Sequence, residues 1–129
     1  MKSHIKLSDY LKIPRIIVGF WQIADMENQG IDFDINSCER DLNNYVQSGF
    51  NTFDMADHYG SSEIILGKFK NKFSRSDIKL FTKWVPSPGK INRDIVRENI
   101  LYSLERMQQK SIDLLQFHTW HYPDPSWLD

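Results

Sequence analysis

Short apolar runs alternate along the chain with longer segments in which apolar residues recur every three or four positions. The short runs are rich in β-branched and aromatic side chains, and each is too brief to form a helix, so each is typical of a buried strand. They cover residues 15–21, 50–54, 78–83 and 112–117. The sequence therefore predicts four short strands, with a polar loop containing Gly30 after the first of them.

Helical periodicity fills the segments between these runs. The first predicted helix lies between Asp34, a plausible N-cap, and Gly49, a plausible C-terminal glycine. Its apolar face carries Ile35, Cys38, Leu42, Tyr45 and Val46. The second helix follows Ser61 or Ser62 as its cap, with Ile64, Ile65 and Phe69 on the inner face. The third covers 92–109 with Asn92 as N-cap, and its inner side carries Ile95, Asn99, Leu101, Leu104 and Met107.

Strands and helices thus alternate strictly, with short connections between them. This order predicts parallel βα units, because each crossover must return the chain to the same end of the sheet. An open doubly wound sheet and a βα barrel both satisfy the pattern. The first strand is not followed by a G-x-G-x-x-G phosphate loop, which disfavours the dinucleotide-binding version of the open sheet.

Composition narrows the class of protein further. Apolar residues make up 40% of the 129 residues and charged residues 26%, as in an ordinary folded domain. The net charge of -1 predicts no bulk attraction to nucleic acid, and the chain has no apolar run long enough for a membrane helix. The single cysteine, Cys38, has no partner for an internal disulfide, which favours a reducing, cytoplasmic location.

Polar side chains collect where the predicted strands end. Asp54 ends the second strand and Tyr59 lies in the loop after it, Lys83 ends the third strand, and His118 ends the fourth. In parallel α/β folds the carboxyl ends of the strands form one face, which carries the active site. Each residue alone has an ordinary structural explanation: a helix cap, a packed tyrosine, a solvated lysine or a core histidine. Their joint placement at successive strand ends favours a functional site.

These four side chains suit the donation of a proton to a carbonyl oxygen. A free tyrosine has a pKa of about 10, and a nearby lysine ammonium favours the phenolate. An aspartate would keep the lysine charged and in place, and a histidine could orient the substrate oxygen or share in proton transfer. None of the four can donate hydride, so a reductase built on them requires a nicotinamide cofactor. A different small α/β enzyme with Asp54 and His118 as acid and base is an alternative, but it leaves Tyr59 and Lys83 without a role.

Residues 53–63, with the sequence FDMADHYGSSE, resemble the signature of the aldo/keto reductase family: an Asp, an Ala, a Tyr-Gly and a Ser-Glu pair. The resemblance extends to GFWQ at 19–22, FTK at 81–83 and DLLQFH at 113–118, and it is collinear from about residue 14 to 125. It implies reversible, NADPH-dependent reduction of aldehydes and ketones on a (β/α)8 barrel without a metal. By this resemblance the chain is an α/β protein corresponding to about the first four βα units of such a barrel.

The resemblance also implies a role for each site residue. Tyr59 would be the general acid, Lys83 its pKa partner, Asp54 the ionic partner of the lysine, and His118 the group that orients the substrate. The residues implied to lie at the nicotinamide end of NADP(H) are Gly19, Phe20, Trp21 and Asp54, and the candidates for an apolar substrate wall are Trp21, Trp84 and Trp120. For Trp84 and Trp120, ordinary packing is the alternative. Phe20 and Met55 stand where many members carry Thr, and Thr119 separates His118 from Trp120.

Length is the feature that does not fit a complete barrel, which typically needs about 250 residues. We expect residues 1–129 to form one aldo/keto reductase-like domain, cut short at its carboxyl end. Four βα units cannot close an eight-stranded barrel, so the edge strands would stay exposed and could pair with a second copy or another subunit. A non-catalytic half-barrel of this kind is the alternative to an enzyme acting on a small carbonyl or alcohol substrate. His118 and His121 lie in a strand-to-loop segment that would not align them, so no metal site is predicted.

Overall fold

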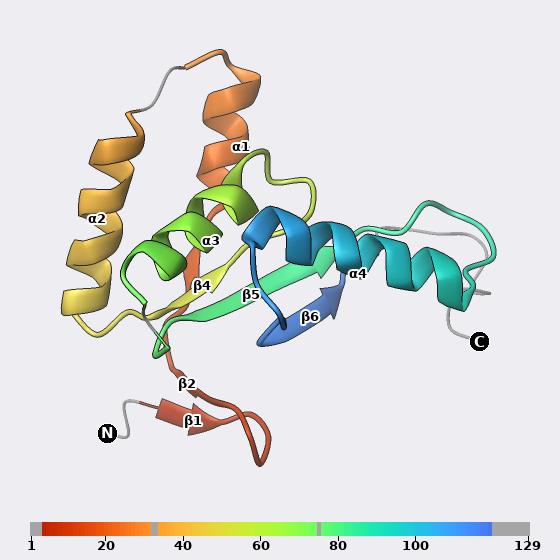
Figure 1. Cartoon of the computed structure of the whole chain (residues 1–129), viewed down its shortest axis with the longest axis horizontal. Coiled ribbons are helices and arrows are strands. Elements are labelled where there is room, and N and C mark those ends of the chain that lie inside the picture. The colour runs from red at the N-terminus through yellow and green to blue at the C-terminus, as the bar shows by residue number, and fades with distance from the viewer. Residues whose placement is uncertain (1–3, 32–33, 75, 120–129) are drawn as a thin grey trace.

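The centre of the molecule is a parallel sheet of four strands, and each strand lies next to its neighbour in sequence (Figure 1). The computed structural model describes residues 4–31, 34–74 and 76–119. In chain order the strands of the sheet are β3 (Val18–Gly19), β4 (Thr52–Asp54), β5 (Lys79–Trp84) and β6 (Leu114–Phe117). The prediction of parallel βα units is thereby confirmed, since all three pairings in the sheet are parallel.

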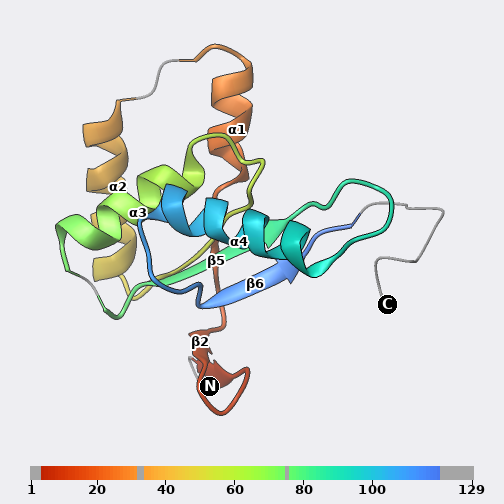
Figure 2. The same ribbon diagram turned by 45° about the vertical axis from the view of Figure 1, so that its right-hand side comes forward.

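Three of the helices pack on one face of this sheet. They are α2 (Ile35–Gln47), α3 (Ser62–Lys72) and α4 (Arg93–Met107), and α3 contacts both of the others (Figures 1 and 2). The core between helices and sheet is apolar and contains Leu42, Val46, Phe53, Leu66, Phe69, Leu80 and Met107 among its buried side chains. The strand residues Phe53 and Leu80 point toward the helices. Because side chains alternate along a strand, the residues on either side of them in β4 and β5 point to the opposite face of the sheet.

The predicted helix caps agree with the structure at three of four positions. The Asn92 side chain accepts a hydrogen bond from the Ile95 N–H at 2.9 Å, and Asp34 Oδ2 accepts one from the Ser37 N–H at 3.1 Å. Gly49 follows α2 with a φ of +89°, a conformation that glycine adopts without strain. Ser61 precedes α3, but its hydroxyl donates to Glu27 and makes no cap.

The predicted strand 15–21 is wrong in its extent. Strand β3 covers only Val18–Gly19, and Trp21 begins the helix α1 (Trp21–Asn28) where a polar loop was expected. The chain leaves the sheet at Phe20, whose N–H donates to the Asp54 carbonyl at 2.9 Å. The apolar residue Ile16 is 62% exposed, so an apolar run here did not mean a fully buried strand.

An antiparallel hairpin that the sequence did not predict precedes the sheet. Its strands are β1 (His4–Lys6) and β2 (Lys12–Pro14), which pair with Ile5 opposite Ile13. In both ribbon views it projects from the body on the side away from α1 (Figures 1 and 2). The short alternation of polar and apolar residues on each side of 7–11 is the signal that could have revealed it.

The buried side of helix α4 differs from the one predicted. Met107 is fully buried, but Ile95 is 37% exposed and Leu101 is 52% exposed, so they do not lie on an inner face. The contact with α3 is centred on the carboxyl end of α4, where a Cβ added to Gly67 would lie 2.0 Å from the Met107 carbonyl oxygen. On α3, Ile65 and Phe69 are buried as predicted, whereas Ile64 is half-buried. Helices α3 and α4 therefore come into backbone contact at Gly67.

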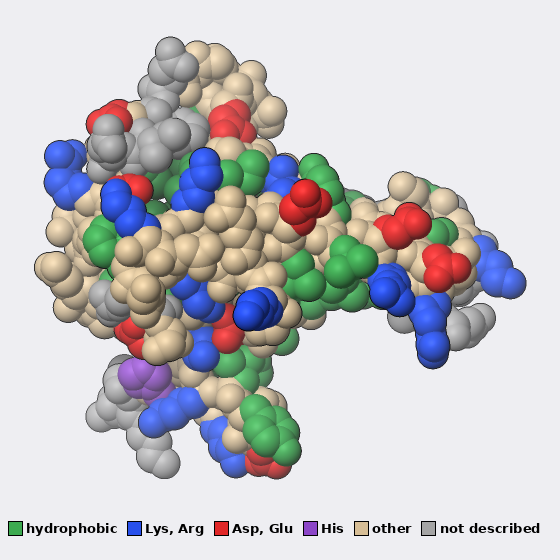
Figure 3. Space-filling model, viewed as in Figure 1, with side chains coloured by type: hydrophobic (Ala, Val, Ile, Leu, Met, Phe, Trp, Pro, Cys, Tyr) green, Lys and Arg blue, Asp and Glu red, His purple; other side chains and the backbone are tan. Residues whose placement is uncertain are grey.

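The surface over α3 and α4 mixes both signs of charge. Lys and Arg side chains are interspersed with Asp and Glu over this face, with exposed apolar side chains between them (Figure 3). Among the described residues, no helix has both the length and the apolar character needed to cross a membrane.

Candidate active site at the carboxyl ends of the strands

Strand register places three polar side chains side by side on the face of the sheet opposite the helices. Asp54 pairs with Phe81, and Lys83 pairs with Gln116, so Asp54, Lys83 and Gln116 lie on adjacent strands with the same side-chain direction. The Gln116 amide donates to Asp54 Oδ1 at 3.0 Å across the sheet. This face is hollowed, with a cavity of about 400 Å³ that Asp54 and Gln116 line together with Gly19 and apolar side chains of the strands and the hairpin.

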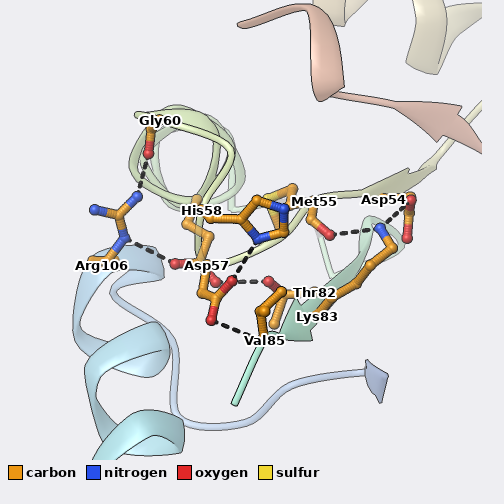
Figure 4. A network of polar contacts seen from close by, with 10 residues as sticks. Asp54, Met55, Asp57, His58, Gly60, Thr82, Lys83, Val85 and Arg106 are labelled. Carbon is orange, nitrogen blue, oxygen red and sulfur yellow. Dashed lines mark hydrogen bonds and ion pairs between the residues drawn. The ribbon is translucent and has the colours of Figure 1, made fainter. Parts of the chain in front are cut away.

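The Lys83 ammonium makes two polar contacts. It lies 2.5 Å from Asp54 Oδ2 and donates to the Met55 carbonyl at 2.8 Å (Figure 4). The two side chains are 13% and 28% exposed, so this ion pair is largely shielded from water. A shielded pair with an additional hydrogen bond holds the lysine side chain in one position.

Tyr59 lies directly next to this lysine. Lys83 Nζ is over the face of the tyrosine ring, 5.0 Å from its centroid, and Tyr59 is only 8% exposed. A cation over an aromatic face is an attractive arrangement. The rings of Trp21 and His58 each meet the Tyr59 ring edge to face, at 5.1 and 4.8 Å between centroids. The tyrosine is therefore held between a cation and two aromatic rings.

His118 follows β6 and approaches the same group of residues. Its N–H donates to the Trp84 carbonyl at 2.9 Å, which continues the ladder between β5 and β6, and its ring lies 5.4 Å from that of His58. Burial and the positive charges of His58 and Lys83 lower the pKa of His118 below its ordinary 6.5, against the opposite effect of Asp57 and Asp54. A neutral imidazole at this place can accept or donate a hydrogen bond.

The loop that carries Tyr59 is attached to β5 by backbone contacts. The Met55 N–H donates to the Phe81 carbonyl at 2.8 Å, and the Asp57 N–H donates to the Lys83 carbonyl at 2.9 Å. The Asp57 carboxylate accepts from the Val85 N–H at 3.0 Å and contacts His58 Nδ1 at 2.8 Å (Figure 4). The loop therefore runs alongside β5 on both sides of Lys83.

The residues predicted near the cofactor lie beside this group. Gly19 pairs with Asp54 in the sheet, and a Cβ added to Gly19 would have no atom within 4 Å, so open space borders its backbone. The Phe20 side chain points into the core, where it meets Phe53 at 5.9 Å between ring centroids, so only its backbone is available to a ligand. Trp21 is 45% exposed, with its ring against Tyr59.

The other two predicted tryptophans differ from Trp21. Trp84 is 4% exposed and packs edge to face on Phe117 at 5.0 Å, and strand alternation directs it away from the face that carries Lys83. This placement favours packing over a substrate wall for Trp84. Trp120 lies outside the described residues.

Four polar residues of this region were not assigned a role from the sequence: Asp57, Glu63, Arg106 and Gln116. Gln116 lies two residues before His118 and shares the strand face of Lys83, so alternation along the fourth strand was a usable signal. Glu63 and Arg106 belong to different helices and pair only through the packing of α3 on α4. Among the described residues, no group of three or more His, Cys, Asp or Glu could hold a metal ion.

The chain thus combines parallel βα units with a Tyr–Lys–Asp group at the carboxyl ends of the strands. The family model for the aldo/keto reductase family matches residues 15–127. The chain belongs to the aldo/keto reductase family. Both the recognition of the family and the fold class, a partial barrel of about four βα units, are confirmed.

Solved structures show the same fold. An aldo-keto reductase from Klebsiella pneumoniae in complex with NADPH superposes with a TM-score of 0.74 at 20% identity, covering 97% of this chain and 42% of that one. An aldo/keto reductase from Brucella melitensis has a TM-score of 0.64 at 27% identity, covering 89% and 41%. One from Bombyx mori in complex with NADP has a TM-score of 0.69 at 22% identity, covering 95% and 39%. The chain therefore spans less than half the length of these proteins.

Proposed function

We propose that this chain carries the proton-donating part of an NADPH-dependent reductase that acts on an aldehyde or ketone, with Tyr59 as the general acid. The observation that carries the proposal is the position of the Lys83 ammonium, over the Tyr59 ring at 5.0 Å. When a phenol gives its proton to a carbonyl oxygen, negative charge develops on the phenol. An adjacent ammonium stabilises that charge and so favours the transfer.

Asp54 and His118 complete the proposed site. Asp54, at 2.5 Å from Lys83, holds the ammonium in place beside the loop that carries Tyr59. His118, whose pKa is lowered by burial and by neighbouring positive charge, stays neutral near neutral pH and orients the substrate oxygen through a hydrogen bond. The substrate carbonyl would then receive its proton from Tyr59 while His118 fixes its direction.

The residues present fit the nicotinamide end of NADP(H). The hollow beside Asp54, Gly19 and Gln116 offers apolar side chains for a flat ring and an amide for its polar edge, and the backbone at Gly19 has open space next to it. When bound there, NADPH would supply the hydride for the carbonyl carbon, which no side chain of the site can donate. Trp21, half-exposed against Tyr59, would form the apolar side of the substrate site.

The decisive experiment is NADPH consumption by the purified chain with a panel of aldehydes and ketones. We expect NADPH-dependent loss of absorbance that Tyr59→Phe abolishes. Tyr10→Phe is the matched control, since Tyr10 is 99% exposed in the hairpin loop and should leave the rate unchanged. A chain that binds no NADPH on titration and consumes none with any substrate of the panel contradicts the proposal.

A second candidate, a half-barrel without catalytic activity that associates with a second copy, is favoured by a different observation. Among the described strands, β3 and β6 are the edges of the parallel sheet. Ile17, next to β3, is 37% exposed, and Phe117, within β6, is 45% exposed. Exposed edge strands are prone to pair with another chain. Size-exclusion chromatography with light scattering tests this, because a monodisperse monomer contradicts self-association.

A further inference from the structure

A second cluster of charged side chains, formed by Glu63 of α3 and Arg106 of α4, lies on the helix side of the sheet. Glu63 is fully buried, and both of its carboxylate oxygens accept hydrogen bonds. Oε1 accepts from the Thr82 hydroxyl at 2.7 Å, and Oε2 accepts from Arg106 Nε at 2.8 Å. A buried carboxylate is tolerated only where its charge is compensated in this way.

Arg106 extends this group to the loop of Tyr59. Its Nη2 donates to the Gly60 carbonyl (Figure 4). Its Nε donates to Glu63. Burial opposes the charge of Arg106, but the hydrogen bonds and charge of Glu63, with a contribution from Tyr102, raise its pKa above the ordinary value. The guanidinium therefore remains charged and joins two acceptors at fixed positions.

The two ends of this group lie next to the two residues that the proposed chemistry requires. Gly60 directly follows Tyr59, and Thr82 directly precedes Lys83. The arrangement depends on the close packing of α3 on α4, which Gly67 permits by leaving room for the Met107 backbone. Neither Glu63 nor Arg106 is hydrogen-bonded to the side chain of Tyr59 or Lys83, so any influence passes through the backbone.

We propose that Glu63 and Arg106 are positioning residues that fix the Tyr59 ring relative to the Lys83 ammonium. This inference rests on the proposed function for its purpose, but its geometry is tested without turnover. Glu63 holds β5 through Thr82, and Arg106 holds the loop through the Gly60 carbonyl, so the separation of Tyr59 and Lys83 is set from behind the sheet. Loss of either contact lets the loop move relative to the strand.

Fluorine NMR of the whole chain labelled with 3-fluorotyrosine tests this proposal. The chain has five tyrosines, and Tyr59→Phe identifies the Tyr59 resonance. We expect a single Tyr59 resonance in the parent chain. In Glu63→Gln and Arg106→Lys we expect it to move by more than its line width and to broaden. Glutamine keeps the size of Glu63 without its charge, and lysine keeps the charge of Arg106 without the planar fork that reaches two acceptors.

A matched control separates positioning from stability. Asp113 contacts Lys70, Lys79 and the Leu80 N–H at the amino ends of the strands, so Asp113→Asn should destabilise the chain without moving the Tyr59 resonance. Thr82→Val, which removes one hydroxyl donor, serves as the milder variant if Glu63→Gln does not fold. A Tyr59 resonance that coincides with the parent in the folded Arg106→Lys and Thr82→Val variants overturns the proposal.

The same experiment distinguishes this proposal from the proposed function. If the resonance moves as expected but the parent chain consumes no NADPH, the positioning of Tyr59 stands and the reductase proposal fails. If the parent is active and the resonance does not move, the positioning role fails and the reductase proposal stands.

Discussion

The two ends of the parallel sheet each carry an aspartate in contact with lysine, yet only one end has the parts of the proposed reactive site. At the amino ends, Asp113 accepts from the Leu80 N–H at 2.9 Å and contacts Lys79 at 3.2 Å and Lys70 at 3.4 Å. At the carboxyl ends, Asp54 contacts Lys83 at 2.5 Å. The two aspartates are similarly shielded, with side chains 18% and 28% exposed.

The difference lies in what surrounds each lysine. Lys79 is 33% exposed, whereas Lys83 is 13% exposed and lies over the ring of Tyr59. The His58 ring lies beside the Tyr59 ring, and the His118 ring lies beside that of His58, at the carboxyl ends of the strands. An aspartate–lysine pair is therefore a structural contact in one setting, and part of a proposed proton-transfer site where a buried phenol adjoins it.

Exchange of each aspartate for its amide is expected to give the largest contrast. Asp54→Asn should lower turnover by roughly 100-fold or more, because Lys83 loses the charge that keeps it in place. Asp113→Asn should leave turnover per folded molecule unchanged. NADPH consumption normalised to the folded fraction checks this, and equal losses in the two variants would contradict the division of roles.

At the amino ends of the strands, substitution of Asp113 should lower the stability of the chain rather than its turnover. Asp113→Asn removes the charge shared by two lysines, and we expect a loss of about 1 kcal/mol in the free energy of unfolding. Urea denaturation followed by circular dichroism measures it. Lys6→Met is the control, because the Lys6–Asp9 pair is exposed and its loss should leave the midpoint unchanged. An unchanged free energy of unfolding in Asp113→Asn would contradict a stabilising role for the contacts of Asp113.

Gln116→Leu should produce a smaller effect confined to the carboxyl end. The substitution removes the 3.0 Å hydrogen bond to Asp54 Oδ1 but leaves the Asp54–Lys83 pair in place. We expect turnover to fall by less than about tenfold, in keeping with the loss of one hydrogen bond to a charged group. A loss as large as that of Asp54→Asn would mean that Gln116 acts on the substrate or cofactor directly.

The smallest expected effect is a shift in the titration of His118. Its pKa lies below the ordinary 6.5, because burial and the charges of His58 and Lys83 disfavour protonation. The unfolded chain then binds the proton more readily, so the contribution of His118 to stability falls as pH decreases below 6.5. NMR titration should place the midpoint below that of the urea-unfolded chain, and His58→Gln should raise it. A midpoint at or above that of the unfolded chain contradicts this electrostatic account.

The sequence was sufficient for the parts of the site that follow from strand ends. Asp54, Lys83 and His118 come together because parallel strands align their carboxyl ends, and Tyr59 follows from its place in the loop after Asp54. Their individual roles remain predictions. The extent of the domain and the implied role of Trp120 also remain predictions, the latter because that residue lies outside the described part of the chain.

Other features depend on tertiary packing that no local pattern records. Glu63 and Arg106 are 43 positions apart and meet only because Gly67 lets α4 approach α3. Helix α1 was missed because its residues show no clear apolar periodicity, and only Ala24 among them is buried. The apolar positions Ile95 and Leu101 misled the prediction for α4, since both are exposed and the buried residues of this helix are Ser103 and Met107.

The most direct test of the central claim compares the two lysines of β5, Lys83→Met with Lys79→Met. Both variants remove an ammonium that contacts an aspartate, but only Lys83 lies over Tyr59. NADPH consumption per folded molecule should fall roughly 10²–10⁴-fold in Lys83→Met, the range typical for loss of general acid catalysis, and stay at the parent level in Lys79→Met. Turnover that survives in Lys83→Met, or falls equally in both, would contradict the claim that the carboxyl end of the sheet is the proton-donating site.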